Sequence, residues 1–149
     1  MVSAGQKIVE VLVEAGIDHV FGLPGGGMGR IWEALQGHQD EIRTILVRDE
    51  QTGGCMADMY GRLTGKPGVF IAQGCFACTT GLFGVLEAYL GSSPMVVLTD
   101  ITDYGVPAQH APLQCGGGEY GNFDIAGIFR SSTKYTTVAH TPVEAVQGV

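Results

Sequence analysis

The sequence predicts an α/β fold, a doubly wound parallel sheet with helices on both faces. Apolar segments with the length of strands alternate along the chain with segments of helical periodicity. The strand segments are continuously apolar, which is typical of parallel strands buried on both faces. The length of 149 residues, with 45% hydrophobic and 15% charged residues, corresponds to one globular domain over residues 1–149.

Four strands and four helices are predicted in the first two thirds of the chain. The strands are expected at residues 18–22, 43–47, 68–72 and 95–99. The helices are expected at residues 8–15, 28–35 and 51–63, and from the turn at Gly74 through Leu90. Gly16 lies at the stop position of the first helix, and turns rich in Gly and Pro separate the later elements.

The last third is expected to begin with a long loop at residues 100–121, because this stretch is polar and contains Pro and many Gly. A short helix near residues 124–129 and a strand near residues 134–138 follow. The last helix is predicted to begin with Thr141 as N-cap and Pro142 at its first position. Ligands of parallel sheets bind at the carboxyl ends of the strands, so the turns after the four strands form the candidate site.

The composition argues against several classes of protein. The net charge of −7 disfavours nucleic acid and anionic membranes as partners, because both require basic patches. The N-terminus is typical of an amphipathic helix rather than a signal peptide, and no apolar stretch approaches membrane-spanning length. The four cysteines follow no secreted disulfide pattern, so we expect a cytoplasmic protein.

Glu50 is the principal catalytic candidate. It follows the second predicted strand and lies beside the small residues Gly53, Gly54 and Cys55, which would let a ring approach. Burial in an apolar site raises the pKa of a carboxyl enough for it to give a proton to a weakly basic ring nitrogen. The alternative is an exposed glutamate at a helix start, which the helix dipole favours.

Three segments of the chain resemble one enzyme family. They read GQKIVEVLVEAGIDHVFGLPGG at residues 5–26, VRDEQTGGCMADMYGRLTGKPGV at residues 47–69, and AYLGSSPMVVLTD at residues 88–100, the last followed by DIAGIFRSSTKYTTVAHTPVEA at residues 124–145. In order and spacing they resemble the N-terminal, pyrimidine-binding domain of thiamine-diphosphate enzymes of the acetolactate synthase and 2-keto acid decarboxylase type. The resemblance covers nearly the whole chain, and the second segment is specific.

The resemblance implies a thiamine-diphosphate-binding fold and roles for the matching positions. Glu50 would hydrogen-bond a pyrimidine ring nitrogen of thiamine diphosphate and so activate the cofactor for attack on a 2-keto acid. The turns after the first and third strands would border the same ring. The positions expected to contact the aminopyrimidine are Pro24, Gly25, Glu50, Gly74, Cys75, Cys78 and Thr79.

The resemblance also implies partners. A second domain with a GDG…N motif would hold the diphosphate and Mg²⁺; this chain has no such motif, so no metal ligand is expected in it. The helices at residues 51–60 and 79–90 carry little charge and are expected to pair two copies of the domain as a homodimer. The chain is expected to be either a fragment or the small subunit of a split enzyme such as sulfopyruvate decarboxylase.

The chain departs from the family in two places. Residues 73–80 read QGCFACTT where acetolactate synthases carry a Ser-Gly-Pro-Gly-Ala-Thr-Asn run, and only Thr79 matches. A Phe-Gln-Glu element of the synthases is replaced by Tyr120, Gly121 and Asn122. The keto acid substrate therefore stays open, and a non-catalytic binding or regulatory module with the same fold is an alternative from another class.

Other motifs favour different chemistry less strongly. The Cys75-x-x-Cys78 spacing between a strand and a helix is used by thioredoxin-like proteins, in which the helix N-terminus lowers a thiol pKa. Two small apolar side chains in a tight turn are the alternative. A zinc site would need a second ligand pair, and the turn at residues 24–27 lacks the order of a phosphate-binding loop. Among the histidines, only His110 on the polar loop merits a test.

Overall fold

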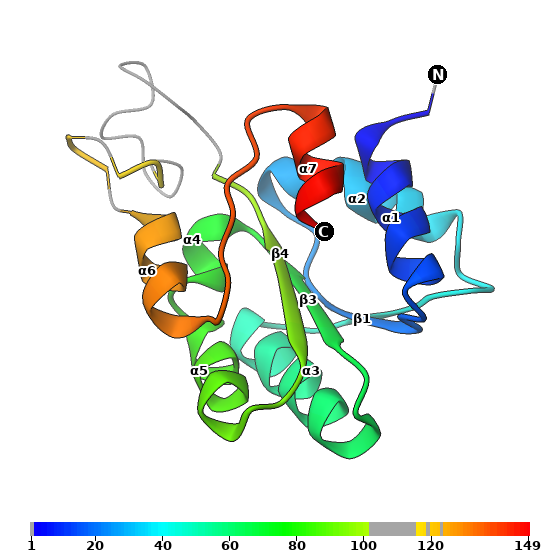
Figure 1. Ribbon diagram of the computed structural model, residues 1–149, viewed down its shortest axis with the longest axis horizontal. Coiled ribbons are helices and arrows are strands. Elements are labelled where there is room, and N and C mark those ends of the chain that lie inside the picture. The colour runs from blue at the N-terminus through cyan, green and yellow to red at the C-terminus, as the bar shows by residue number, and fades with distance from the viewer. Residues whose placement is uncertain (1, 102–115, 119, 123) are drawn as a thin grey trace.

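The computed structural model in Figure 1 describes residues 2–101, 116–118, 120–122 and 124–149. Its centre is an all-parallel sheet of four strands in the order β2-β1-β3-β4. The strands are β1 (His19–Gly22), β2 (Arg43–Leu46), β3 (Gly68–Ala72) and β4 (Met95–Thr99). The chain passes from β1 to β2 and then returns to the other side of β1 for β3 and β4, so the predicted doubly wound sheet is confirmed.

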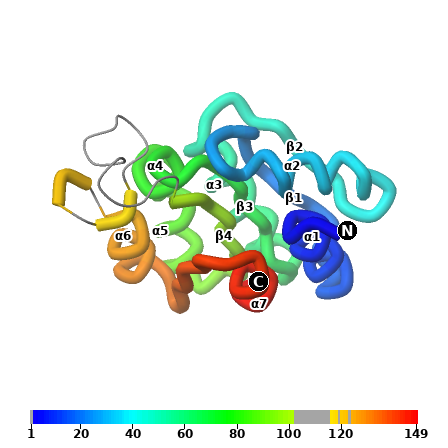
Figure 2. Tube along the Cα trace, turned by 90° about the horizontal axis from the view of Figure 1, so that it is seen from above, coloured from blue at the N-terminus to red at the C-terminus, as the bar shows by residue number. Residues whose placement is uncertain are grey.

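Helices cover both faces of this sheet. They are α1 (Ala4–Glu14), α2 (Gly29–Gln36), α3 (Glu50–Thr64), α4 (Gly74–Ala77), α5 (Leu82–Gly91), α6 (Ile125–Ser132) and α7 (Pro142–Gly148), with the short 3-10 turn η1 (Gly26–Met28). The helices α1, α2 and α7 lie on one side of the sheet, and α3 and α5 lie on the other (Figure 1). Figure 2 shows α7 beside α1, so the two ends of the chain are neighbours.

The core consists of two apolar layers that share β3. All five residues of this strand are buried. Val69 and Ile71 pack in the layer under α1 and α2, whereas Phe70 and Ala72 pack in the layer that contacts α3 and α5. Successive side chains of a strand point to opposite faces, so a strand covered by helices on both sides has to be apolar throughout.

One predicted helix is divided in the structure. The helix expected at residues 74–90 becomes α4 and α5. The break arises because the N–H of Gly81 donates to the carbonyl of Phe76, five residues back, rather than to that of Ala77. The regular helical pattern from residue i to residue i−4 ends there and begins again in α5.

One predicted strand is wrong. Residues 134–138 form an irregular segment between α6 and α7, and none of the four described strands pairs with them. The β-branched residues Thr136, Thr137 and Val138 favour a strand, but that preference depends on a neighbouring strand with which to pair. No helix in the described part of the chain has both the length and the apolar character needed to cross a membrane.

An ion pair between a buried aspartate and an exposed arginine of α3 also contacts α5. The carboxylate of Asp58, which is 5% exposed, accepts two hydrogen bonds from Nε of Arg62 at 3.0 and 2.9 Å and one from the hydroxyl of Ser93. Arg62 also donates from Nη2 to the carbonyl of Glu87 in α5 at 2.9 Å. Because the side chain of Arg62 is 37% exposed, removing Asp58 leaves a cation that water can solvate, and the cost is chiefly that of the lost hydrogen bonds.

We expect the Asp58→Ala variant to lose about 2 kcal/mol of unfolding free energy in urea titrations, because the hydrogen bonds to a charged carboxylate are lost while Arg62 stays in contact with water. The matched control is Asp40→Ala, which removes an exposed aspartate and should change the free energy by less than about 0.5 kcal/mol. Equal losses in the two variants would contradict a stabilising role for the ion pair.

Candidate functional site

The carboxyl ends of the four strands lie at one edge of the sheet. A glycine turn follows β1, the start of α3 follows β2, α4 follows β3, and Asp100 follows β4. The order of strands reverses between β1 and β3, which is where open parallel sheets bind their ligands. The turns that hold most of the predicted site residues therefore meet at the expected edge.

Glu50 is the first residue of α3. Asp49 caps this helix, since its carboxylate accepts a hydrogen bond from the N–H of Thr52 at 2.8 Å. The Glu50 residue is half-buried, and its carboxylate makes no hydrogen bond or ion pair within the described part of the chain. The strong burial expected from the sequence is not reached within this chain, so a ligand or a neighbouring molecule would have to complete it.

Asp100 connects two of the turns at this edge. Its Oδ1 accepts a hydrogen bond from the N–H of Gly74 at 2.6 Å, and its Oδ2 accepts one from the N–H of Gly27. Gly26 has a φ of 53°, and a Cβ atom there would lie 2.4 Å from Oδ2 of Asp100, so this position requires glycine. No role was predicted for Asp100 from the sequence, although an acidic residue at the carboxyl end of a strand is also what drew attention to Glu50.

Two of the other predicted contacts lie in the turn after β3. Gly74 is buried so closely against β4 that a Cβ atom on it would lie 2.0 Å from the carbonyl oxygen of Asp100. Cys75 is 6% exposed. Burial raises the pKa of its thiol, and the negative charges of Asp100 and Glu50 raise it further. Cys75 therefore lies within electrostatic reach of both carboxylates.

The remaining predicted contacts are placed differently. Pro24 is exposed and Gly25 half-buried in the turn after β1, and Thr79 is exposed with its hydroxyl donating to the carbonyl of Cys75 at 2.5 Å. Cys78 is 2% exposed and packs in the apolar layer beneath α3 and α5. The structure thus places Cys78 in the core and not at the ligand-binding edge, because it belongs to the buried cluster that contains Phe70 and Val85.

The thiols of the Cys75-x-x-Cys78 motif are unsuited to redox chemistry. Burial raises the pKa of Cys78 to about 11 and also raises that of Cys75. Redox motifs of this spacing need the opposite shift, because the thiolate is the reactive form. The alternative of two small side chains packed in a turn describes the motif better.

We expect Cys75 and Cys78 to resist iodoacetamide in the folded protein at pH 8. A pKa near 11 for Cys78 lowers its thiolate fraction roughly 100-fold relative to a free cysteine, and burial restricts access as well. Mass spectrometry of the alkylated peptides should show slow labelling that becomes fast in urea. Rapid labelling of Cys75 in the native protein, or ready formation of a Cys75–Cys78 disulfide, would restore the redox interpretation.

Gly53 and Gly54 serve helix packing rather than ligand access. A Cβ atom on Gly53 would lie 2.9 Å from Cε2 of Phe70, and one on Gly54 would lie 2.8 Å from the carbonyl oxygen of Gly81. A Cβ atom on Gly84 of α5 would in turn lie 2.2 Å from the carbonyl carbon of Gly54. The glycines therefore let α3 lie directly against the sheet and against α5, and the expectation that they admit a ring does not fit their positions.

Known proteins identify the family of this domain. The family described as "Thiamine pyrophosphate enzyme, N-terminal TPP binding domain" matches residues 2–114. The chain belongs to this family. The prediction of the family from three sequence segments is thereby confirmed, and the doubly wound sheet agrees with it.

Acetolactate synthases are among the relatives of this thiamine pyrophosphate enzyme domain. The large subunit from Buchnera aphidicola subsp. Acyrthosiphon pisum is 35% identical over 136 residues, which are 91% of this chain and 22% of the relative. The acetolactate synthase of Bacillus subtilis is 41% identical over 133 residues, 88% of this chain and 21% of the relative. Isozyme 3 of Escherichia coli is 33% identical over 136 residues. The chain thus spans about a fifth of the length of the curated relatives it matches.

The residues at the carboxyl ends of the strands fit the pyrimidine half of thiamine pyrophosphate, the cofactor in the family's name. A half-buried carboxylate without a partner in the described chain, Glu50, is available to a ring nitrogen. The turn that begins at Pro24 and Gly25 offers backbone rather than bulky side chains. Among the described residues, no group of three His, Cys, Asp or Glu side chains is arranged to hold a metal ion. His110 and Cys115 lie outside the described residues.

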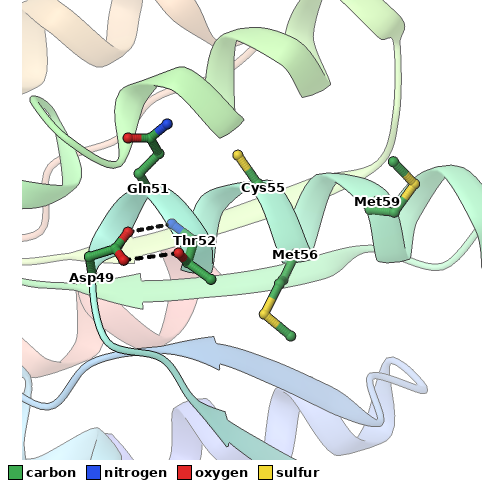
Figure 3. Close-up of a pocket in the computed structure, with 6 residues that line it drawn as sticks. All are labelled: Asp49, Gln51, Thr52, Cys55, Met56 and Met59. Carbon is green, nitrogen blue, oxygen red and sulfur yellow. Dashed lines mark hydrogen bonds between the residues drawn. The ribbon is translucent and has the colours of Figure 1, made fainter.

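A shallow hollow lies on the outer side of α3. It measures about 640 Å³ and is lined by Asp49, Gln51, Thr52, Cys55, Met56 and Met59 (Figure 3). The side chains of Gln51 and Cys55 project from the same side of the helix, and Asp49 holds Thr52 through the capping hydrogen bonds. Glu50 does not line this hollow.

Proposed function

We propose that this domain binds the aminopyrimidine ring of thiamine diphosphate and activates it through Glu50, as part of an enzyme that decarboxylates or ligates 2-keto acids. The observation that carries the proposal is the position of the Glu50 carboxyl. Glu50 begins α3 at the ligand-binding edge of a domain of this family, and the N-terminus of the helix is capped by Asp49 and not by Glu50. The names of the acetolactate synthase relatives support the substrate class.

The residues of this chain bind and orient the ring and exchange a proton with it. The backbone of Pro24 and Gly25 borders one side, and Gly74 and Cys75 border the other. The carboxyl of Glu50 shares a proton with a ring nitrogen, at a point that the bound ring shields from water. When bound, thiamine diphosphate supplies the nucleophilic carbon that attacks the keto group of the substrate.

The diphosphate and Mg²⁺ are held, in this proposal, by a second domain or subunit. The chain spans about a fifth of its relatives' length, and the relatives therefore have ample sequence for such a domain. The catalytic unit then needs both parts, whether they lie in one polypeptide or in two. Its place of action is the cytoplasm.

In the complete enzyme, we expect Glu50→Gln to lower kcat by roughly 100-fold or more, because the amide cannot exchange a proton with the ring nitrogen. The matched control is Glu14→Gln, which changes an exposed glutamate in α1 on the other side of the sheet and should leave kcat unchanged. Circular dichroism would check the fold of both. Full activity in the Glu50 variant would favour a non-catalytic role for this domain.

We also propose that two copies of the domain pair through the outer face of α3 and α5. Seven large apolar side chains are exposed there: Met56, Met59, Leu63, Phe83, Leu86, Tyr89 and Leu90. Leu63 is 79% exposed and Leu90 is 76% exposed, which is unusual for so many neighbouring apolar residues. A partner on this face would also cover the hollow beside Cys55 and bring a second chain close to the start of α3.

We expect Phe83→Glu to shift the protein from dimer to monomer in sedimentation-velocity measurements, because a charge would be buried at the centre of the proposed interface. Val143→Glu is the matched control, since Val143 is also apolar and exposed but lies on α7 on the opposite side of the sheet. The control should sediment as the unmodified protein does. A monomeric unmodified protein at high concentration would contradict the dimer.

A further inference from the structure

Asp100 occupies a position that the proposed function does not yet explain. It follows β4, a strand that supplies none of the proposed contacts with the aminopyrimidine. Its carboxylate nevertheless reaches both turns that border the proposed ring. The register of β3 and β4 pairs Ala72 with Thr99, which places Asp100 beside the start of α4.

The side chain of Asp100 crosses the end of β3. Gly74, which donates its N–H to Oδ1 at 2.6 Å, belongs to the turn directly after β3. Gly27, which donates its N–H to Oδ2, belongs to the turn after β1, on the far side of β3 in the sheet order. One carboxylate thus joins turns on two different strands.

The glycine turn after β1 is shaped around this carboxylate. Cβ atoms on Gly26 and Gly27 would lie 2.4 and 3.0 Å from Oδ2 of Asp100, so the carboxylate fills the space that side chains would need. The N–H groups of Gly27 and Gly74 lie near the starts of η1 and α4, where a helix provides no backbone acceptor, so they require another acceptor. Hydrogen bonds to an ionised carboxylate are stronger than those between neutral groups, so this link is well suited to fix the two turns.

We propose that Asp100 is a positioning residue that fixes the glycine turn after β1 relative to the turn at Gly74 and Cys75, and thereby sets the shape of the crevice for the aminopyrimidine. It acts through the backbone of the two turns and does not touch the ring. The consequence for the ring rests on the proposed function, whereas the link between the turns does not.

The link is tested by nuclear magnetic resonance of the chain labelled with nitrogen-15. The amide protons of Gly27 and Gly74 should resonate at low field, as expected for donors to a carboxylate. Asp100→Ala should move both signals to high field, and added formate should return them toward their original positions. Asp100→Asn keeps one acceptor oxygen and should retain one of the two low-field signals, so it serves as a second variant if the alanine variant does not fold. Asp40→Ala is the control and should change neither signal.

The consequence for the ligand is tested on the same samples with the isolated aminopyrimidine fragment of thiamine. Asp100→Ala should weaken its binding about tenfold, with recovery in formate, because small displacements of bordering groups are costly. A loss of affinity caused by partial unfolding of the domain would not recover when formate is added. Unchanged Gly27 and Gly74 signals in Asp100→Ala would overturn the link, and shifted signals with unchanged affinity would overturn the positioning role. If the unmodified chain does not bind the fragment while the signals shift as expected, the link stands and the proposed function fails.

Discussion

The burial of β3 on both faces is the constraint on which the rest of the structure depends. All five of its residues are buried, so the strand needs helices above and below it and a strand on each side. β1 and β4 supply the flanking strands, and the helices that connect them supply the two layers. The same arrangement brings the chain back across β1, which creates the reversal of strand order where the glycine turn and α4 meet.

The amino and carboxyl ends of the strands differ in how their acidic side chains are hydrogen-bonded. At the amino edge, Asp18 binds Nδ1 of His19 at 2.9 Å, Nζ of Lys66 at 2.7 Å and the hydroxyl of Tyr60. These hydrogen bonds, of which that from His19 is the strongest influence, hold the pKa of Asp18 well below its usual range. At the carboxyl edge, Glu50 has no such partners among the described residues. Within the described part of the chain, Glu50 thus keeps its carboxylate available where a ligand would bind.

The sequence was sufficient for the architecture because β3 and its neighbours are apolar over their whole length, and such runs have few other stable arrangements. It failed at residues 134–138, where β-branched residues were read as a strand although strand formation depends on a partner that local sequence does not reveal. It located the turn after β3 but not the direction of each side chain, so the core position of Cys78 was missed. The link made by Asp100 was missed because it joins residues 73 positions apart, and such pairings follow only from the folded topology.

The contact between Gly54 and Gly84 makes α3 and α5 a single mechanical unit. With no side chain between the two backbones, neither helix can slide past the other without a collision. Glu50 begins one of these helices, and the other carries Phe83 and Leu90 on its outer surface. A partner bound on that outer surface would therefore contact the same closely packed pair of helices that positions the Glu50 carboxylate.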